Sequence, residues 1–284
     1  MAELLKGKAV AEAINQRSIE TVNALKDHGI QPALSIFRVG NREDDLSYER
    51  GALKRCAEVG VEVVQYIFDE DVSEEEFYLK LEEANRNDKI HGILVFRPLP
   101  KRFDDEKLRN SILPEKDVDG CSDLSMAGVF TDRALGFAPC TAQSVIEMLD
   151  HYKIDLKGKN IVVIGRSLVI GKPVSMLLLK RNATVTICHS RSVDLPQIAS
   201  EADILVCAIG KAEMIDHSYT NPDQVVIDVG INWSEEKQKL CGDVYFDDVE
   251  NNVRAISPVP GGIGSITTAV LVSHVVEAAH RKMK

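Results

Sequence analysis

Short apolar runs alternate with segments of helical apolar spacing along the first 150 residues. Runs rich in β-branched and aromatic residues predict strands, and apolar residues recurring every three to four positions predict helices. Ser73 and Glu76 have the spacing of a capping box and mark one helix start. The predicted elements are a helix around 10–25, strands over 33–39, 61–68 and 90–95, a helix over 46–59 and a helix from 73. Such alternation gives a parallel sheet covered by helices.

Residues 142–264 repeat this style with a sheet of their own, whose strands lie near 161, 184, 204 and 226. The expected fold class is therefore α/β, with two three-layer α/β domains. The last segment, about 265–283, has a broad apolar stripe at helical spacing and must pack against a core. The stripe consists of Val270, Leu271, Val275, Val276 and Ala279.

A glycine-rich turn joins a strand to a helix in the second half of the chain. Ile161 to Ile164 form a short buried strand, Gly165 ends it, and Gly171 opens the next helix. Such a turn exposes backbone N–H groups where a pyrophosphate can bind, so the sequence favours a dinucleotide site. The spacing Gly165-x-Ser167-x-x-x-Gly171 departs from the usual Gly-x-Gly-x-x-Gly. An ordinary tight turn is the alternative.

The strand that follows, over 183–188, points to the kind of dinucleotide. An NAD enzyme usually has a carboxylate at this strand end for the ribose 2′-hydroxyl. This chain has His189, Ser190 and Arg191 instead. These groups suit a 2′-phosphate, so NADP is favoured over NAD, and Arg166 in the glycine-rich turn is a second candidate partner. The alternative for Arg191 is a solvated surface residue.

Composition excludes some classes of protein. The 284 residues have a formal net charge of −10, which argues against a nucleic-acid partner. The six cysteines form no C-x-x-C pair and no cluster with histidine, so we expect no metal site and no disulfide framework, but free thiols in a reducing cytoplasm. The amino terminus lacks the apolar core of a signal peptide, and no run approaches the ~20 apolar residues of a membrane helix.

Six short segments, in order, resemble one enzyme family. They are Lys116-Asp117-Val118-Asp119-Gly120, Pro139-Cys140-Thr141, Val163-Ile164-Gly165-Arg166-Ser167, Val185-Thr186-Ile187-Cys188-His189-Ser190, Val226-Ile227-Asp228-Val229-Gly230-Ile231-Asn232 and Pro258-Val259-Pro260-Gly261-Gly262-Ile263-Gly264. The set is similar to the bifunctional methylenetetrahydrofolate dehydrogenases/methenyltetrahydrofolate cyclohydrolases of one-carbon metabolism.

The resemblance implies a domain for each ligand. A folate-binding catalytic domain would comprise 1–141 and 265–284, and an NADP-binding Rossmann-like domain would comprise 142–264, with the C-terminal helix returning to the first. A homodimer acting on tetrahydrofolate one-carbon derivatives is also implied. The implied residues are Tyr48 and Asp119 for catalysis, Tyr48, Asp119, Pro260, Gly261 and Gly262 for substrate, and Gly165, Arg166, Ser167, Ser190, Arg191 and Ile231 for the cofactor.

Two of these assignments also have a physical basis. The Asp119 carboxylate could accept the adjacent N–H donors of a pterin's amino-pyrimidinone edge, although an aspartate in a turn can equally stabilise the turn itself. Prolines and glycines in 258–264 fix the backbone in places and allow close ligand approach in others. A plain interdomain connection is the alternative for this loop.

The chain departs from the family at two positions. The family has a lysine four residues after the tyrosine and a glutamine before Leu-Pro-Leu-Pro, and here these positions hold Ala52 and Phe96. Lys54 lies about 200° round the helix from position 52 and does not replace the lysine. Arg55 returns to the face of Tyr48, but about 10 Å along the axis.

These departures separate two reactions. Hydride transfer needs mainly alignment of the folate with the cofactor, whereas hydrolysis of the methenyl bridge needs a positioned acid or base. We therefore expect a methylenetetrahydrofolate dehydrogenase whose cyclohydrolase activity is weak or lost. The alternatives are a fully bifunctional enzyme with a substitute base, a different NADP oxidoreductase resembling shikimate dehydrogenase, and a non-catalytic protein that binds folate and NADP.

Overall fold

The computed structural model describes residues 2–235 and 237–283 and contains two compact units. The first, the large-sheet unit, comprises Met1–Ala11 and Thr141–Thr267. The second, the small-sheet unit, comprises Glu12–Cys140 and Thr268–Lys284. Each unit has a parallel sheet of its own, which confirms the predicted α/β class.

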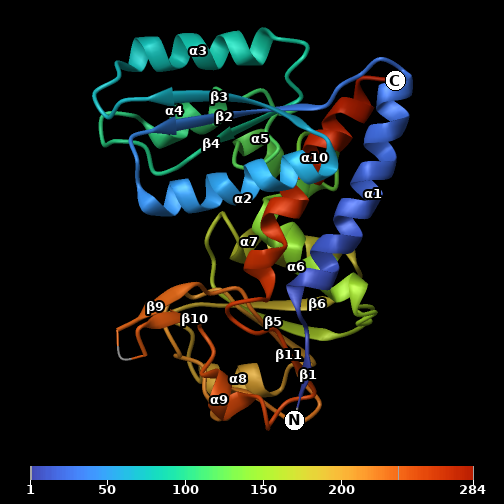
Figure 1. Cartoon of the computed structure of the whole chain (residues 1–284). Coiled ribbons are helices and arrows are strands. Elements are labelled where there is room, and N and C mark those ends of the chain that lie inside the picture. Colours follow the sequence, from blue (N-terminus) through green and yellow to red (C-terminus); the bar gives the residue numbers. More distant parts are fainter. Residues whose placement is uncertain (1, 236, 284) are drawn as a thin grey trace. The chain divides into compact units, whose positions relative to one another are not determined.

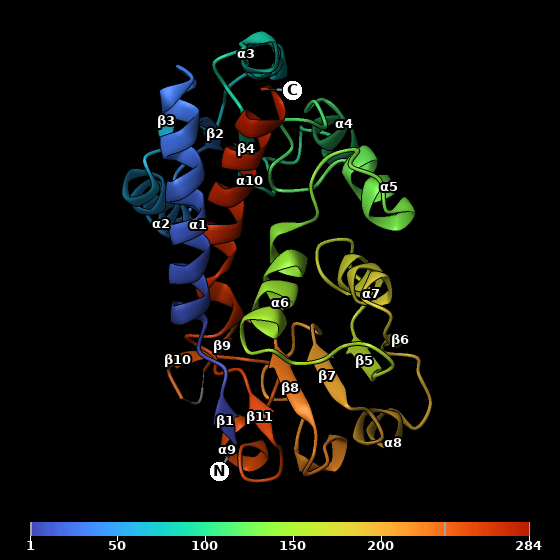
Figure 2. The ribbon, with the colours of Figure 1, turned by 90° about the vertical axis from the view of Figure 1, so that its right-hand side faces the viewer.

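Six parallel strands form the sheet of the large-sheet unit (Figure 2). In spatial order they are β1 (Glu3–Leu4), β11 (Ala255–Ile256), β8 (Val225–Asp228), β7 (Ile204–Cys207), β5 (Asn160–Ile164) and β6 (Thr184–Cys188). The interior strands β5, β7 and β8 consist mostly of Val, Ile and Leu because both faces of the sheet are covered.

Helices lie on both faces of this sheet, with α6 and α7 on one side and α8 and α9 on the other in Figures 1 and 2. A separate antiparallel pair, β9 (Asn232–Ser234) and β10 (Lys239–Cys241), follows β8. The helices of this unit are α6 (Cys140–His151), α7 (Gly171–Lys180), α8 (Leu195–Ser200) and α9 (Phe246–Val249), with the 3₁₀ turns η1 (His217–Tyr219) and η2 (Ile263–Ser265).

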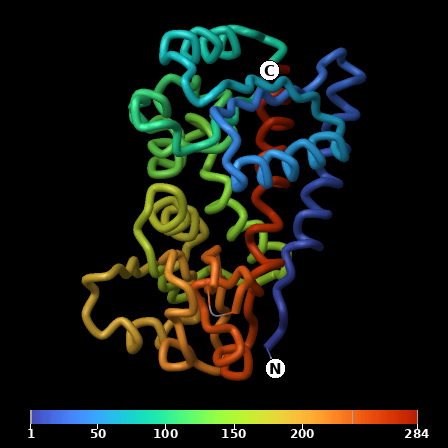
Figure 3. Tube along the Cα trace, turned by 60° about the vertical axis from the view of Figure 1, so that its left-hand side comes forward, coloured from blue at the N-terminus to red at the C-terminus, as the bar shows by residue number. Residues whose placement is uncertain are grey.

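The first strand joins the large sheet through pairing that the sequence pattern did not indicate. Glu3 pairs with Ala255 and Leu4 with Ile256 in parallel register. In Figure 3 the blue N-terminal segment lies beside the orange-red chain of β11. The first residues therefore belong to the large-sheet unit, whereas the sequence-based boundaries placed them with 12–141. A two-residue strand has too little pattern to be recognised from sequence.

The small-sheet unit has three parallel strands in the order β3–β2–β4, with α3 on one face and α2 on the other (Figure 1). The strands are β2 (Ala33–Val39), β3 (Glu62–Phe68) and β4 (Gly92–Val95). The helices that lie wholly or mostly in this unit are α1 (Gly7–Asp27), α2 (Glu43–Val59), α3 (Glu74–Arg86), α4 (Asp105–Asn110), α5 (Asp123–Thr131) and α10 (Thr267–Arg281).

Local signals explain the ends of these helices. Ser73 Oγ accepts the N–H of Glu76 at 3.1 Å, which confirms Ser73 as the N-cap of α3. The α2 helix begins three residues earlier than the apolar pattern indicates, with an acidic first turn that suits the helix dipole. It ends at Gly60, which adopts the left-handed conformation at φ 87°.

The C-terminal helix α10 belongs to the small-sheet unit, as predicted. His274 Nδ1 lies 2.8 Å from the carbonyl oxygen of Val118, and the Arg281 guanidinium donates to the Gly136 carbonyl. The segment Ile263–Arg281 is long and apolar enough to cross a membrane by length and composition, with a mean hydropathy of 1.2. Because 61% of that window is buried inside the protein, a core helix accounts for its composition.

Candidate functional site

The turn from β5 into α7 leaves no room for a side chain at Gly165 or at Gly171. Gly165 has φ +137°, and a Cβ there would lie 2.2 Å from the carbonyl oxygen of Ala208. A Cβ on Gly171 would lie 2.2 Å from the carbonyl oxygen of Gly165. Ser167 Oγ accepts the N–H of Ile170 at 3.2 Å and holds the turn. The turn therefore packs backbone against backbone at the carboxyl end of β5.

This turn lies where the strand order of the large sheet reverses. The chain goes from β5 to β6 on one side and then to β7 on the other side of β5. In doubly wound sheets the crevice outside the carboxyl ends at such a switch point binds ligands. Gly165 follows β5 and Ala208 follows β7, so the predicted turn occupies this place.

The candidate phosphate-binding side chains are exposed near this edge. Arg166 and Ser167 follow β5, and Ser190 and Arg191 follow the neighbouring strand β6. The second pair belongs to a turn in which the N–H of Arg191 donates to His189 Nδ1 at 3.2 Å. Among the described residues, neither Arg166 nor Arg191 forms an ion pair. Both guanidinium groups are therefore available to an anion.

A cavity of about 210 Å³ brings together residues from two of the sequence motifs. Ile231 lines it with the loop 258–265, which includes Pro260, Gly261 and Gly262. A Cβ on Gly264 would lie 3.3 Å from Ile231 Cδ1, so a side chain there would narrow the cavity. The cavity has the size for a flat ring and a backbone-lined wall that permits close approach.

Two buried carboxyl groups that the sequence analysis did not select hold the loops around this cavity. The Asp228 carboxyl accepts the N–H groups of Gly230, Asp243 and Val244 at 2.9, 3.0 and 3.0 Å. Asp243 is fully buried and accepts Asn232 Nδ2 at 3.0 Å as well as three backbone N–H groups of the loop after β7. The Val226–Asn232 motif contains Asp228, but a buried aspartate cannot be told from an exposed one by sequence spacing.

In the small-sheet unit, Tyr48 and Phe96 form an aromatic pair. Tyr48 lies on α2 and Phe96 directly follows β4, and their rings meet edge to face at 5.9 Å. Phe96 is buried, and Ala52, one turn after Tyr48 on α2, is fully buried. An apolar surface therefore occupies both positions at which the sequence departs from the family pattern.

The nearby cations on α2 differ in their environment. The side chain of Lys54 is 79% exposed, and its Nζ lies 3.9 Å from Glu58 Oε1. Arg55 is half-buried and engaged in an interaction of its own. Helix geometry predicts that Lys54 lies on the opposite face from position 52, and the exposure of the Lys54 side chain agrees with this prediction.

The Lys-Asp-Val-Asp-Gly motif divides its residues between structure and chemistry. Lys116 Nζ donates to the carbonyl oxygens of Ala84, Asn85 and Asn87 at 3.0, 2.6 and 2.8 Å, at the C-terminal end of α3. Asp117 is buried and accepts the Ser125 hydroxyl at 2.6 Å. Asp117 also accepts two backbone N–H groups of the turn before α5.

Asp119 is the residue of this motif that is half-exposed and so can meet a ligand. Burial raises the pKa of its carboxyl, and the charge of Asp117 raises it further. The positive charge of Arg97 opposes both effects and lowers this pKa. The sequence analysis considered Phe96 but did not select its neighbour Arg97 as a site residue. The positive charge of Arg97, next to a family motif, could have identified it.

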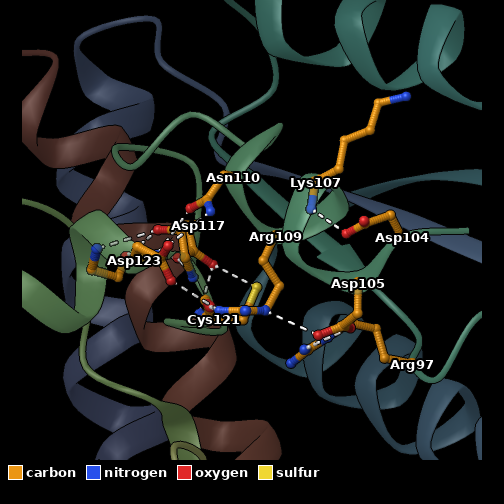
Figure 4. Close-up of polar contacts among 11 residues, drawn as sticks. Arg97, Asp104, Asp105, Lys107, Arg109, Asn110, Asp117, Cys121 and Asp123 are labelled. Atoms are coloured by element: carbon orange, nitrogen blue, oxygen red, sulfur yellow. Dashed lines mark hydrogen bonds and ion pairs between the residues drawn. The ribbon is translucent and has the colours of Figure 1, made fainter.

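Arg97 is held by a chain of ion pairs that runs over α4 to the start of α5 (Figure 4). Its guanidinium lies 3.4 Å from Asp105 Oδ1, and Asp105 also pairs with Arg109 at 3.0 Å. Arg109 in turn pairs with Asp123 at 3.0 Å. The network fixes the position of a cation whose charge acts on Asp119.

One group of side chains among the described residues has metal-ligand spacing. Ligand atoms of Asp216, His217 and Asp248 lie within 4.8 Å of one another. They are already engaged, because His217 Nδ1 lies 2.8 Å from Asp248 Oδ2 and Asp216 caps η1 through Ser218. The group is a surface hydrogen-bond cluster that joins η1 to α9.

Comparison with known proteins covers nearly the whole chain. Residues 5–119 match the family model described as "Tetrahydrofolate dehydrogenase/cyclohydrolase, catalytic domain". Residues 139–283 match the model described as "Tetrahydrofolate dehydrogenase/cyclohydrolase, NAD(P)-binding domain". The "Bifunctional protein FolD" of Clostridioides difficile is 50% identical over 276 residues, which are 97% of this chain and 96% of that protein.

Solved structures of similar proteins have the same fold. The FolD methylenetetrahydrofolate dehydrogenase/cyclohydrolase of Campylobacter jejuni has a TM-score of 0.95 at 34% identity, covering 99% of this chain and 100% of that one. The methylenetetrahydrofolate dehydrogenase-cyclohydrolase of Trypanosoma brucei, solved with NADP cofactor and an inhibitor, has a TM-score of 0.92 at 31% identity, covering 100% and 99%.

Proposed function

Because this chain belongs to the tetrahydrofolate dehydrogenase/cyclohydrolase family, we propose that it oxidises 5,10-methylenetetrahydrofolate to 5,10-methenyltetrahydrofolate with NADP, and that its cyclohydrolase activity is weak or absent. The observation that carries the second part is the apolar pair of positions, Ala52 and Phe96. The active form is proposed to be a homodimer, as the family resemblance implies, and its cysteine pattern favours a location in the reducing cytoplasm.

The features of the large-sheet unit fit a nicotinamide dinucleotide. The Gly165–Gly171 turn presents backbone at the switch point, and Arg166 and Arg191 are exposed cations for the phosphates. The cavity beside Ile231 has room for the nicotinamide ring. When bound, the cofactor supplies the hydride acceptor. We therefore assign residues 142–264 to cofactor binding, and Ser167 and Ser190 are among the residues proposed to contact the cofactor.

The small-sheet unit supplies the proposed folate-binding groups. Asp119, as a carboxylate, would accept the adjacent N–H donors of the pterin, and Tyr48 would line the same ligand. Pro260, Gly261 and Gly262, which belong to the large-sheet unit, are the other residues that the family resemblance assigns to the substrate. These residues bind and orient the methylene bridge, and alignment of this kind can contribute ~7–11 kcal/mol to a barrier reduction.

Hydrolysis of the methenyl product requires a group that can hold or move a proton. Neither the Ala52 methyl nor the Phe96 ring can do this. The charged neighbour Lys54 is paired at the surface with Glu58. An enzyme with alanine and phenylalanine at these two positions would release methenyltetrahydrofolate or hydrolyse it slowly.

A fully bifunctional enzyme is the second candidate. The names of the relatives, such as the FolD of Clostridioides difficile at 50% identity, favour it. Arg55, half-buried on the face of Tyr48, is the group that would have to act in place of the lysine. This candidate predicts methenyltetrahydrofolate hydrolysis well above the rate in buffer.

One pair of assays tests both parts. Methylenetetrahydrofolate is supplied with NADP or NAD, reduced cofactor is followed by absorbance, and an acid quench measures methenyl product. Methenyltetrahydrofolate is then supplied alone. We expect faster reduction of NADP than of NAD, accumulation of the methenyl product, and hydrolysis close to the buffer rate. No reduction of either cofactor would refute the dehydrogenase, and rapid hydrolysis would refute the loss of the cyclohydrolase.

A further inference from the structure

One charged residue lines the cavity beside Ile231. This residue is Asp228. Among the described residues, the rest of the cavity wall consists of apolar side chains, backbone and one serine. Asp228 ends β8, an interior strand of the sheet, and is 3% exposed. Its carboxyl accepts backbone N–H donors and has no cationic partner within ion-pair distance in residues 2–235 and 237–283. A negative charge here is solvated by N–H dipoles alone.

The other charged groups around Asp228 lie away from this cavity. Asp243, in the segment after β10, lies close enough to Asp228 to raise its pKa, but it does not line this cavity and accepts its own backbone N–H donors. A second cavity of about 130 Å³ shares Asp228, and its lysine Lys237 is already paired with Glu213. The titratable and charged groups that line the second cavity with Asp228 are Glu213, Lys237, Lys239, Cys241 and Asp247. Asp243, Cys207 and Cys241 lie close enough to interact with the charge of Asp228.

Both charge states of Asp228 are accessible near neutral pH. Burial raises the pKa of its carboxyl to about 7, and the charge of Asp243 adds to this, while the N–H donors lower it. The carboxyl is therefore largely ionised at pH 8 and largely neutral at pH 6. The cavity thus gains a negative charge over this interval.

We propose that the Asp228 carboxylate makes this cavity bind the oxidised nicotinamide ring in preference to the reduced ring. The proposal rests on the proposed function, which places the nicotinamide in this cavity. The two forms of the cofactor have the same phosphates, riboses and adenine, but the oxidised ring carries a positive charge and the reduced ring is neutral. A buried carboxylate attracts the first and not the second.

The preference would favour turnover in the oxidative direction. The enzyme would take up the oxidised cofactor and lose affinity for it once the hydride has neutralised the ring. Asp228 is then a specificity-determining residue for the redox state of the cofactor, and it acts through its charge without accepting or donating a proton in the reaction.

Equilibrium binding tests the proposal without turnover. Trp233 is the only tryptophan of the chain and pairs across β9–β10 with Leu240, which lines the cavity, so its fluorescence can report binding. The dissociation constants of NADP and of reduced NADP are measured for the wild type and for Asp228→Asn at pH 8. The ratio of interest is the dissociation constant of reduced NADP divided by that of NADP. We expect Asp228→Asn to lower this ratio roughly tenfold, because NADP loses the attraction of the carboxylate.

A pH series on the wild type gives the same test without a substitution. The ratio should rise between pH 6 and pH 8.5, the interval over which the carboxyl of Asp228, with a pKa of about 7, becomes ionised. The 2′-phosphate titrates in both cofactors and cancels in the ratio. Asp247→Asn is the matched control, because Asp247 lines the second cavity only and its side chain is 72% exposed. It should leave the ratio and its midpoint unchanged.

The outcomes separate this proposal from the one on which it rests. Binding of both forms with a ratio that does not change with pH, or that Asp228→Asn leaves unaltered, would overturn the role of Asp228 while leaving the dehydrogenase intact. Equal weakening of both forms would mean that Asp228 only holds the loops. Failure to bind either form would overturn the proposed function as well.

Discussion

The ring of Tyr48 stands edge-on against the ring of Phe96, with centroids 5.9 Å apart and planes at 81°. An aromatic edge thus occupies the place at which a side-chain amide could hold a lysine on the next turn of α2. Ala52, on that turn, is fully buried and has no polar group. The proposed loss of hydrolysis therefore has two linked causes, and one substitution alone should not reverse it.

We expect the double variant Ala52→Lys with Phe96→Gln to gain methenyltetrahydrofolate hydrolysis, by up to ~10²–10⁴-fold over the wild type, since a positioned acid or base has effects of this size. The matched control is Ala52→Met with Phe96→Gln, which has a chain of similar length without the amine. Thermal unfolding of both variants shows whether they are folded. Equal hydrolysis by the two would contradict the stated cause.

Arg97 should set the pH range of folate binding. Asp119 must be ionised to accept the pterin N–H donors, so KM for methylenetetrahydrofolate should rise as pH falls through the raised pKa of Asp119. Arg97→Leu removes the charge that lowers this pKa, so the rise should begin at higher pH. The measurement is KM against pH.

Arg97→Lys is the control for this effect because it keeps the positive charge while changing the geometry. Its profile should stay close to that of the wild type. If Arg97→Leu left the profile in place, the charge of Arg97 would have no influence on substrate binding.

Arg191 should contribute to the choice between NADP and NAD. Its exposed guanidinium has no ion-pair partner among the described residues, and a charge-assisted hydrogen bond to the 2′-phosphate is worth roughly 1.5–3 kcal/mol. Arg191→Ala should therefore raise KM for NADP roughly ten- to a hundredfold and leave KM for NAD unchanged. Arg181→Ala, which removes an exposed arginine that is paired with Asp150, is the control. A parallel loss with both cofactors would refute 2′-phosphate recognition.

His91 should make the protein acid-sensitive. It is buried at the start of the β4 segment, and burial lowers its pKa to about 4, with the charge of Lys282 acting in the same direction. The unfolded chain then binds a proton that the folded chain does not bind between about pH 6.5 and 4. Stability should fall by about 3 kcal/mol as pH decreases through this interval.

Urea unfolding at several pH values measures this dependence. The variant His91→Gln, which cannot take up the proton, should lose most of the slope over the same interval. The exposed His28→Gln is its control and should keep the slope of the wild type. An unchanged slope in His91→Gln would assign the acid sensitivity to other groups.

Most of the fold could be predicted from the sequence because its elements are long and strongly patterned. The strand over 33–39 was predicted with its exact bounds, and those over 61–68 and 90–95 differ from the structure by one or two residues at their first residue. The two-residue β1 was missed because its pairing with β11 depends on residues some 250 positions away. No local pattern records such a partner.

The part of the candidate site that could be predicted from the sequence is its glycine-rich turn. Gly165 and Gly171 were found because only glycine fits where backbones touch. The roles of Asp228 and Arg97 depend on burial and on charges from other elements, which spacing does not show. The residue assignments for folate and cofactor remain predictions until ligands are bound.

The chain passes between its two compact units at three places, near residues 11, 140 and 267. No single stretch of the polypeptide therefore encodes either unit. A fragment ending near 140 would lack α10 and the apolar side chains it buries, and the complementary fragment would lack β1, one of the two partners of β11. Separate expression of either half should yield incomplete cores, whereas mixing the two halves could regenerate the protein by complementation.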